Sequence, residues 1–143
     1  MHEDTIHLLE DCTAGIDIAV STMDGLLLEI RDQALRQTLR RGIREHQQLR
    51  NRTVSLLQSY GSCEKLPSAM AKSMAWLKTN TRMALRKDDT TAAYLVADGC
   101  DTGIKTLCRS RNRYAGATQA AVDLTQDLIR CQEALSAGMR PYF

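Results

Sequence analysis

Apolar side chains recur every three or four residues along most of the chain, the spacing that gathers them on one face of an α-helix. The clearest such run predicts a long helix over residues 33–60. Its apolar face lists Leu35, Leu39, Gly42, His46, Leu49, Thr53 and Leu56. Arginine, glutamine and asparagine occupy the opposite face, so the helix is amphipathic. The pattern therefore turns His46 towards other helices.

The same period predicts four further helices, over residues 5–30, 68–86, 90–114 and 118–137. Residues that favour helix ends stand at their boundaries: Asp32 and Thr118 as N-terminal caps, Pro67 in a first turn and Gly61 just past a last turn. No stretch alternates like a β-strand. The sequence thus predicts one all-α domain over residues 1–143.

Two glycines interrupt the first predicted helix. Gly15 and Gly25 each weaken a helix by roughly 1 kcal/mol relative to alanine. We interpret them as sites of close helix packing, with an early break of the helix as the alternative at Gly25.

The lengths of the predicted helices favour a particular topology. Two long hairpins, over 5–60 and 90–137, are joined by a shorter helix of about 19 residues, which rises ~28 Å at ~1.5 Å per residue. Such a helix can cross the full height of a bundle, so that the second and fourth helices run in the same direction. We therefore expect a ferritin-like antiparallel four-helix bundle with a shorter fifth helix as the crossover.

Composition narrows the class of protein. Aromatic residues make up 4% of the 143 residues, as in helical proteins packed with aliphatic side chains. A formal net charge of +2 does not predict a nucleic-acid partner, and the arginine-rich face over 31–52 lacks interleaved aromatics. No run of ~18 apolar residues predicts a membrane span, and no secretory signal opens the chain. Five cysteines cannot all pair within one chain, so we expect reduced thiols and a cytoplasmic location.

Polar residues with metal-binding chemistry gather at one predicted level of the bundle. Asp17 and His46 lie almost equally far from the first turn, and Cys100 and Cys131 almost equally far from the last. If the two turns lie at opposite ends, all four fall near mid-height. The candidate metal ligands are Asp17, Glu45, His46, Asp101 and Asp127, with Cys100 and Cys131 as candidate thiol ligands. Carboxylate, imidazole and thiol groups suit iron, zinc or copper.

Each of these residues also has a simpler interpretation. A buried histidine is commonly satisfied by a carbonyl, a side chain or a water, and free cysteines are commonly small core residues. Asp101 and Lys105 are spaced for an ion pair along one helix. The arginines of the second helix form a solvated face.

The double-hairpin pattern and the stretch Asp98-Gly-Cys-Asp-Thr-Gly-Ile-Lys105 resemble uncharacterised bacterial ferritin-like four-helix-bundle proteins. The resemblance covers most of the chain in pattern. Di-iron members of that superfamily carry Glu-x-x-His in each of two helices. Here Glu45 is followed directly by His46, with Gln48 in the place of the histidine, and Arg130 stands three residues after Asp127. The resemblance therefore implies a degenerate site, or a site for another metal, rather than a ferroxidase.

Two functional hypotheses follow. In the first, the chain is a bundle protein that binds a metal in its mid-height polar layer; no nucleophile or phosphate-loop motif decides whether it is an enzyme. In the alternative, it is a metal-free bundle that works by association, as a homodimer or with a protein partner. The interface candidates are Met70, Met74, Trp76 and Leu77 on the third predicted helix.

Overall fold

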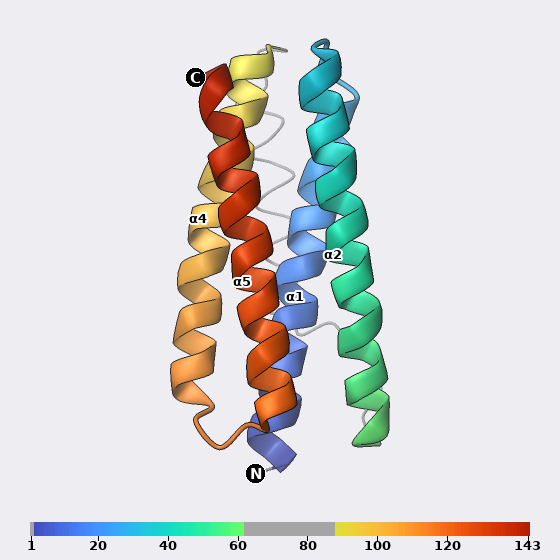
Figure 1. The fold of residues 1–143 in the computed structure, drawn as a ribbon, viewed down its shortest axis with the longest axis vertical. Helices are drawn as coiled ribbons and strands as arrows, with labels where there is room; N and C mark the ends of the chain where they lie inside the picture. The colour runs from blue at the N-terminus through green and yellow to red at the C-terminus, as the bar shows by residue number, and fades with distance from the viewer. Residues whose placement is uncertain (1, 62–87) are drawn as a thin grey trace.

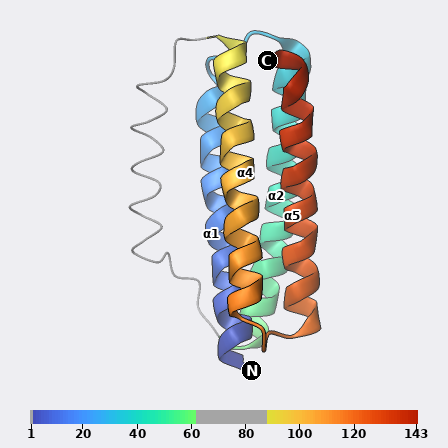
Figure 2. The same cartoon turned by 90° about the vertical axis from the view of Figure 1, so that its left-hand side faces the viewer.

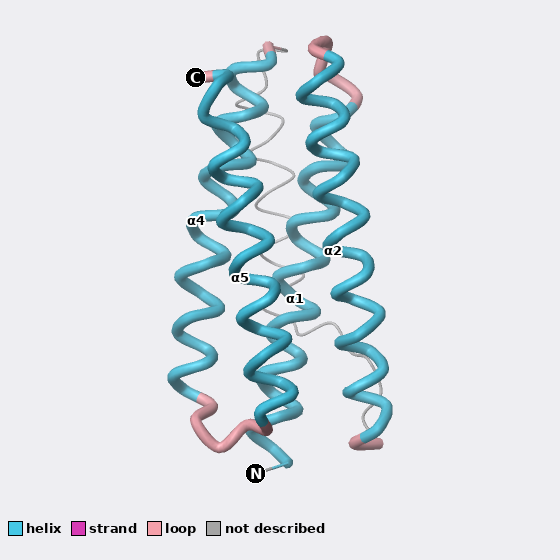
Figure 3. The backbone as a smooth tube through the Cα atoms, in the orientation of Figure 1, coloured by secondary structure: helices cyan, strands magenta, loops and turns pink. Residues whose placement is uncertain are grey.

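The computed structural model describes residues 2–61 and 88–143, which form four long α-helices (Figure 1). They are α1 (His2–Leu27), α2 (Gln33–Ser59), α4 (Asp89–Arg113) and α5 (Gln119–Met139), followed by a short 3-10 turn, η1 (Arg140–Tyr142). The described residues contain no strand (Figure 3), which confirms the all-α prediction. The helix predicted over 68–86, with Met70, Met74, Trp76 and Leu77, lies outside the described residues.

The four helices pack as two antiparallel hairpins. The turn between α1 and α2 lies at one end of the bundle and the turn between α4 and α5 at the other, so α2 and α4 run in the same direction (Figure 1). Around the bundle, α1 packs on α2, α2 on α5, α5 on α4 and α4 on α1 (Figure 2). The predicted antiparallel four-helix bundle and the opposite placement of its two turns are confirmed.

Local sequence determines where the helices begin and end. The Asp32 carboxylate accepts a hydrogen bond of 2.8 Å from the Leu35 amide at the start of α2, and the Thr118 hydroxyl accepts one from the start of α5. Gly61 follows α2 with φ +71°, a left-handed conformation that glycine adopts without strain. The predicted caps at Asp32, Thr118 and Gly61 are confirmed.

Each hairpin also holds the turn of the other one. The carboxylate of Asp89, at the start of α4, accepts hydrogen bonds of 2.9 Å from the amides of Arg31 and Asp32 in the α1–α2 turn. At the opposite end, the carboxylate of Asp4 in α1 accepts a 2.9 Å bond from the amide of Gly116 in the α4–α5 turn. We call these two contacts the end clasps. They join the hairpins at both ends of the bundle.

The apolar core is divided along its length. One cluster, towards the α1–α2 turn, includes Met23, Leu26, Leu35, Leu39, Leu135 and Met139. The other, towards the α4–α5 turn, includes Leu8, Leu9, Leu49, Leu107, Leu124 and Leu128. Buried His46 and Gln132 belong to neither cluster. None of the described helices combines the length and the apolar character needed to span a membrane.

Candidate functional site

His46 lies in α2 with no exposed surface, as its place on the apolar stripe predicts. One helical turn earlier, the carbonyl oxygen of Gly42 stands 2.7 Å from the ring nitrogen Nδ1. A carbonyl can only accept, so Nδ1 carries the proton and donates it. The other ring nitrogen, Nε2, is then left with a lone pair, and it has no hydrogen-bond partner among the described residues.

Burial lowers the pKa of His46 below its ordinary value of 6.5. The Gly42 carbonyl and the Glu45 carboxylate act in the opposite direction but are weaker than the loss of hydration. His46 is therefore a neutral imidazole at neutral pH.

This depressed pKa predicts a loss of stability in mild acid. Below about pH 6.5 the unfolded chain binds a proton at His46 that the folded chain does not, so stability is complete above that pH and falls below it. We expect stability to fall as the pH drops from about 7 to about 5, and His46→Gln to abolish that part of the fall. Urea unfolding across this range measures it, with His7→Gln as the exposed control. A His46→Gln protein with the pH dependence of the unsubstituted chain would contradict the assignment.

The thiol of Cys131, on α5, lies beside this histidine. Its sulfur is 3.7 Å from His46 Nδ1 and 3.7 Å from Glu45 Oε2. Across from it on α4, Cys100 is near enough that charge on one thiol would disfavour charge on the other. Glu45, His46, Cys100 and Cys131 are thus the predicted site residues that the structure brings together, and we call them the thiol–imidazole group.

The thiols of this group are not nucleophiles in the resting protein. Burial raises the pKa of Cys100 to about 12, with further contributions from Asp101 and Cys131. Burial and the Glu45 carboxylate raise the pKa of Cys131 to about 12 as well. His46 does not act as a base towards Cys131, because the nitrogen facing that thiol already carries a proton. The geometry therefore gives no support to cysteine catalysis.

The aspartates predicted as ligands have other partners. Asp17 accepts a 2.7 Å bond from the guanidinium of Arg50, and Asp127 a 3.1 Å bond from that of Arg52. Asp17 thus faces α2 at the expected level, but it meets an arginine one turn beyond His46. The first pair connects α1 to α2 and the second connects α5 to α2. Each carboxylate is therefore already engaged by a guanidinium.

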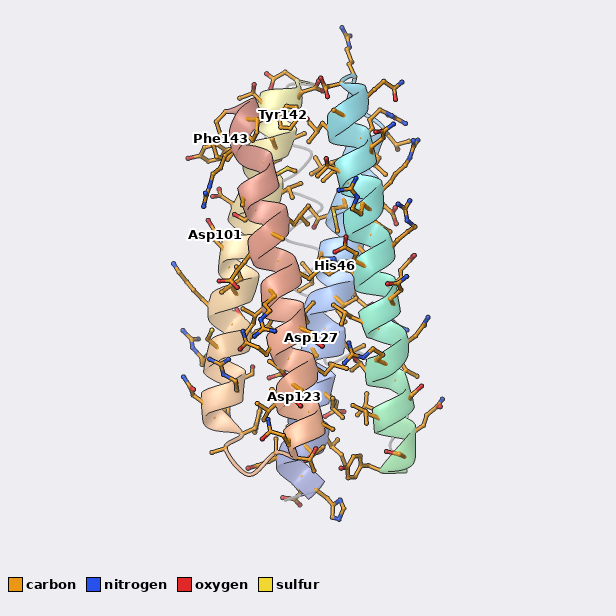
Figure 4. All side chains as sticks on the ribbon, in the orientation of Figure 1. His46, Asp101, Asp123, Asp127, Tyr142 and Phe143 are labelled. Carbon is orange, nitrogen blue, oxygen red and sulfur yellow. The ribbon has the colours of Figure 1, made fainter. Side chains whose placement is uncertain are left out.

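Asp101 is the third aspartate outside the group. It is exposed on α4 and accepts a 3.0 Å bond from the hydroxyl of Ser136 (Figure 4). Within residues 2–61 and 88–143, no set of three or more His, Cys, Asp or Glu side chains forms a site able to hold a metal. The carboxylate-bridged di-iron centre of the ferritin-like superfamily therefore does not fit these residues, in line with the departures from its motif noted in the sequence.

One buried polar residue was not anticipated. Gln132 is 2% exposed, and its carbonyl oxygen Oε1 has no partner among the described residues. A side-chain carbon at Gly103, on α4, would overlap with that oxygen. The signal was present in the sequence, because Gln132 is spaced four residues after Leu128 and three before Leu135. The pattern placed Cys131 on this stripe, whereas the structure has it half-buried at the edge.

Comparison with protein families, with curated proteins and with solved structures finds no match to this chain.

Proposed function

We propose that this protein binds a single Cu(I) ion through the thiol–imidazole group. The observation that carries the proposal is the position of Cys131, whose sulfur lies 3.7 Å from the imidazole nitrogen of His46. At the bond lengths of zinc sites, ~2.3 Å to sulfur and ~2.0–2.1 Å to nitrogen, two ligands of one ion would be about 3.6–3.8 Å apart for tetrahedral or trigonal angles. The two atoms are thus already spaced as ligands of one ion.

The ligand types favour copper in its reduced state. Soft thiolate ligands select Cu(I). Two ligands alone would bind this ion in a line, with sulfur and nitrogen ~4.3 Å apart at the bond lengths above, so the 3.7 Å spacing calls for a third ligand. No set of three ligands is already assembled in the described part of the chain, so a third ligand must move in when the ion binds. Cys131 and His46 supply two ligands, and the neighbouring Cys100 is the third candidate. Iron is a poorer fit, because it prefers carboxylate ligands and the carboxylates of Asp17 and Asp127 are paired with arginines.

Binding must release protons from this site. To hold the ion, the Cys131 thiol would give its proton to solvent, and so would Cys100 if it took part. To bind through Nδ1, His46 would carry its proton on Nε2 instead and would give up its bond to the Gly42 carbonyl. Because the pKa of both thiols is about 12, the apparent affinity should rise with pH across the neutral range.

The test is an anaerobic titration of the reduced, full-length protein with Cu(I) in the presence of a coloured Cu(I) chelator. We expect one equivalent to be withheld from the chelator, and Cys131→Ser to weaken binding by at least about a hundredfold. Cys108→Ser is the matched control, because Cys108 is also a half-buried free thiol but lies outside the group. Zn²⁺ in a parallel titration should bind less tightly.

Two results would refute the proposal. The first is failure of the unsubstituted protein to compete for Cu(I). The second is undiminished binding by Cys131→Ser, which would assign the ion to other thiols.

A further inference from the structure

Two buried hydrogen-bond acceptors lie between the two apolar clusters, at a level that we now call the polar layer, and the described residues provide no donor for either. One is His46 Nε2, whose lone pair is exposed to the core because the proton sits on Nδ1. The other is Gln132 Oε1, a carboxamide oxygen that can only accept. They belong to different helices, α2 and α5. His46 is 0% exposed and Gln132 is 2% exposed.

Such atoms are costly without a partner. An unsatisfied buried acceptor destabilises a fold by roughly 1–3 kcal/mol, and native proteins rarely leave two in one layer. The neighbouring groups do not supply the missing donors. The Cys131 thiol is within hydrogen-bonding distance of the Glu45 carboxylate, and Gly42 contributes only a carbonyl, which is an acceptor. The chemistry required is a small molecule that donates hydrogen bonds and accepts few.

One of these acceptors, the Gln132 carboxamide oxygen, occupies the space that a glycine leaves on α4. Gly103 has no side chain at the point where the Gln132 carboxamide approaches α4. A glycine in the interior of a helix costs about 1 kcal/mol relative to alanine. The presence of Gly103 is therefore explained by the close approach of the Gln132 carboxamide, which a side chain would block. Buried water characteristically occupies polar sites of this kind, making two to four hydrogen bonds.

We infer that the polar layer is a hydration site, in which buried water donates hydrogen bonds to His46 Nε2 and to Gln132 Oε1. Water divides the two apolar clusters and fixes the tautomer of His46, because a donor at Nε2 keeps the proton on Nδ1. The inference concerns the metal-free protein and does not depend on copper binding.

The experiment is water–protein nuclear Overhauser spectroscopy on metal-free, full-length protein, together with the imidazole ¹⁵N shifts of His46. We expect cross-peaks from slowly exchanging water to the ring protons of His46 and to the carboxamide protons of Gln132, with ¹⁵N shifts of an Nδ1-protonated ring. Gln132→Leu should remove the water contact at α5, whereas Gln47→Leu, on the exposed face of α2, should change neither signal.

An ordered water within about 2.7–3.2 Å of each acceptor in a crystal structure would support the same conclusion. The inference is overturned if a protein group donates to either acceptor at that distance, or if the His46 ring shows no contact with water in the unsubstituted chain. An Nε2-protonated ring would also overturn it, because that nitrogen would then be a donor.

Discussion

Gly103→Ala is expected to destabilise the folded protein by about 1–2 kcal/mol, although alanine is the better helix former. The added carbon would occupy the place of Gln132 Oε1, and Gln132 is too deeply buried to move aside freely. Gly99→Ala is the matched control on the same helix. A side-chain carbon there meets nothing within 4 Å, so that variant should gain about 0.5–1 kcal/mol.

Chemical denaturation measures both variants, and a double substitution locates the cause. In Gly103→Ala combined with Gln132→Ala, the overlap is gone, so adding Gly103→Ala to Gln132→Ala should no longer be destabilising. Equal stabilisation by Gly99→Ala and Gly103→Ala would show that Gln132 does not approach α4 as described. Equal stabilisation would also remove Gln132 Oε1 as one of the two acceptors on which the hydration site rests.

Asp89→Ala is expected to cost about 2 kcal/mol, because it removes one end clasp. Hydrogen bonds to a charged group contribute roughly 1.5–3 kcal/mol each when well formed, and the partial exposure of this carboxylate reduces the value. The loss of stability should first appear in the α1–α2 turn, which this clasp holds. Amide hydrogen exchange should accelerate at Arg31 and Asp32, the two donors, before it changes elsewhere.

The amide of Gly116 provides an internal reference for that experiment, because the Asp4 clasp at the other end stays intact. Asp98→Ala, an exposed aspartate on the same helix, controls for the change in charge. Unaltered exchange at Arg31 and Asp32 in Asp89→Ala would mean that the clasp does not hold the turn in solution.

The features that follow from local sequence were predictable. Caps act on the nearest few residues, so Asp32, Gly61 and Thr118 could be assigned without knowledge of the tertiary structure. The burial of His46 followed from helical periodicity alone. Counting from the turns also places Cys100 and Cys131 at the same level, and in the structure the two thiols are near enough that charge on one would disfavour charge on the other.

The features that depend on the rotation of a helix were not predictable. Cys131 and Gln132 are neighbours in sequence and point about 100° apart, since a helix has ~3.6 residues per turn. A small rotation of α5 decides which of them enters the core, and packing against three other helices sets that rotation. The choice of Arg50 as the partner of Asp17 is likewise a property of two packed surfaces.

The glycines give the same lesson. The sequence suggests close packing at Gly15 and Gly25, yet a side-chain carbon at either position meets no neighbouring atom within 4 Å. The close approaches occur at Gly103 and at Gly42, where such a carbon would stand 3.2 Å from the sulfur of Met23. Sequence shows where glycine stands but not which side of the helix faces a neighbour.

The end clasps also limit how the molecule can move. If one hairpin slipped along the other by a single helical turn, ~5.4 Å, the carboxylates of Asp4 and Asp89 would both leave the amides that they hold. Slippage in either direction would therefore break hydrogen bonds at both ends of the bundle at once. Separation of α2 from α5 alone would instead break contacts on that one face, such as the Arg52–Asp127 ion pair, without requiring loss of both clasps. Entry of an ion or of water to mid-height should therefore proceed by lateral separation of α2 from α5, while the axial register of the bundle stays fixed.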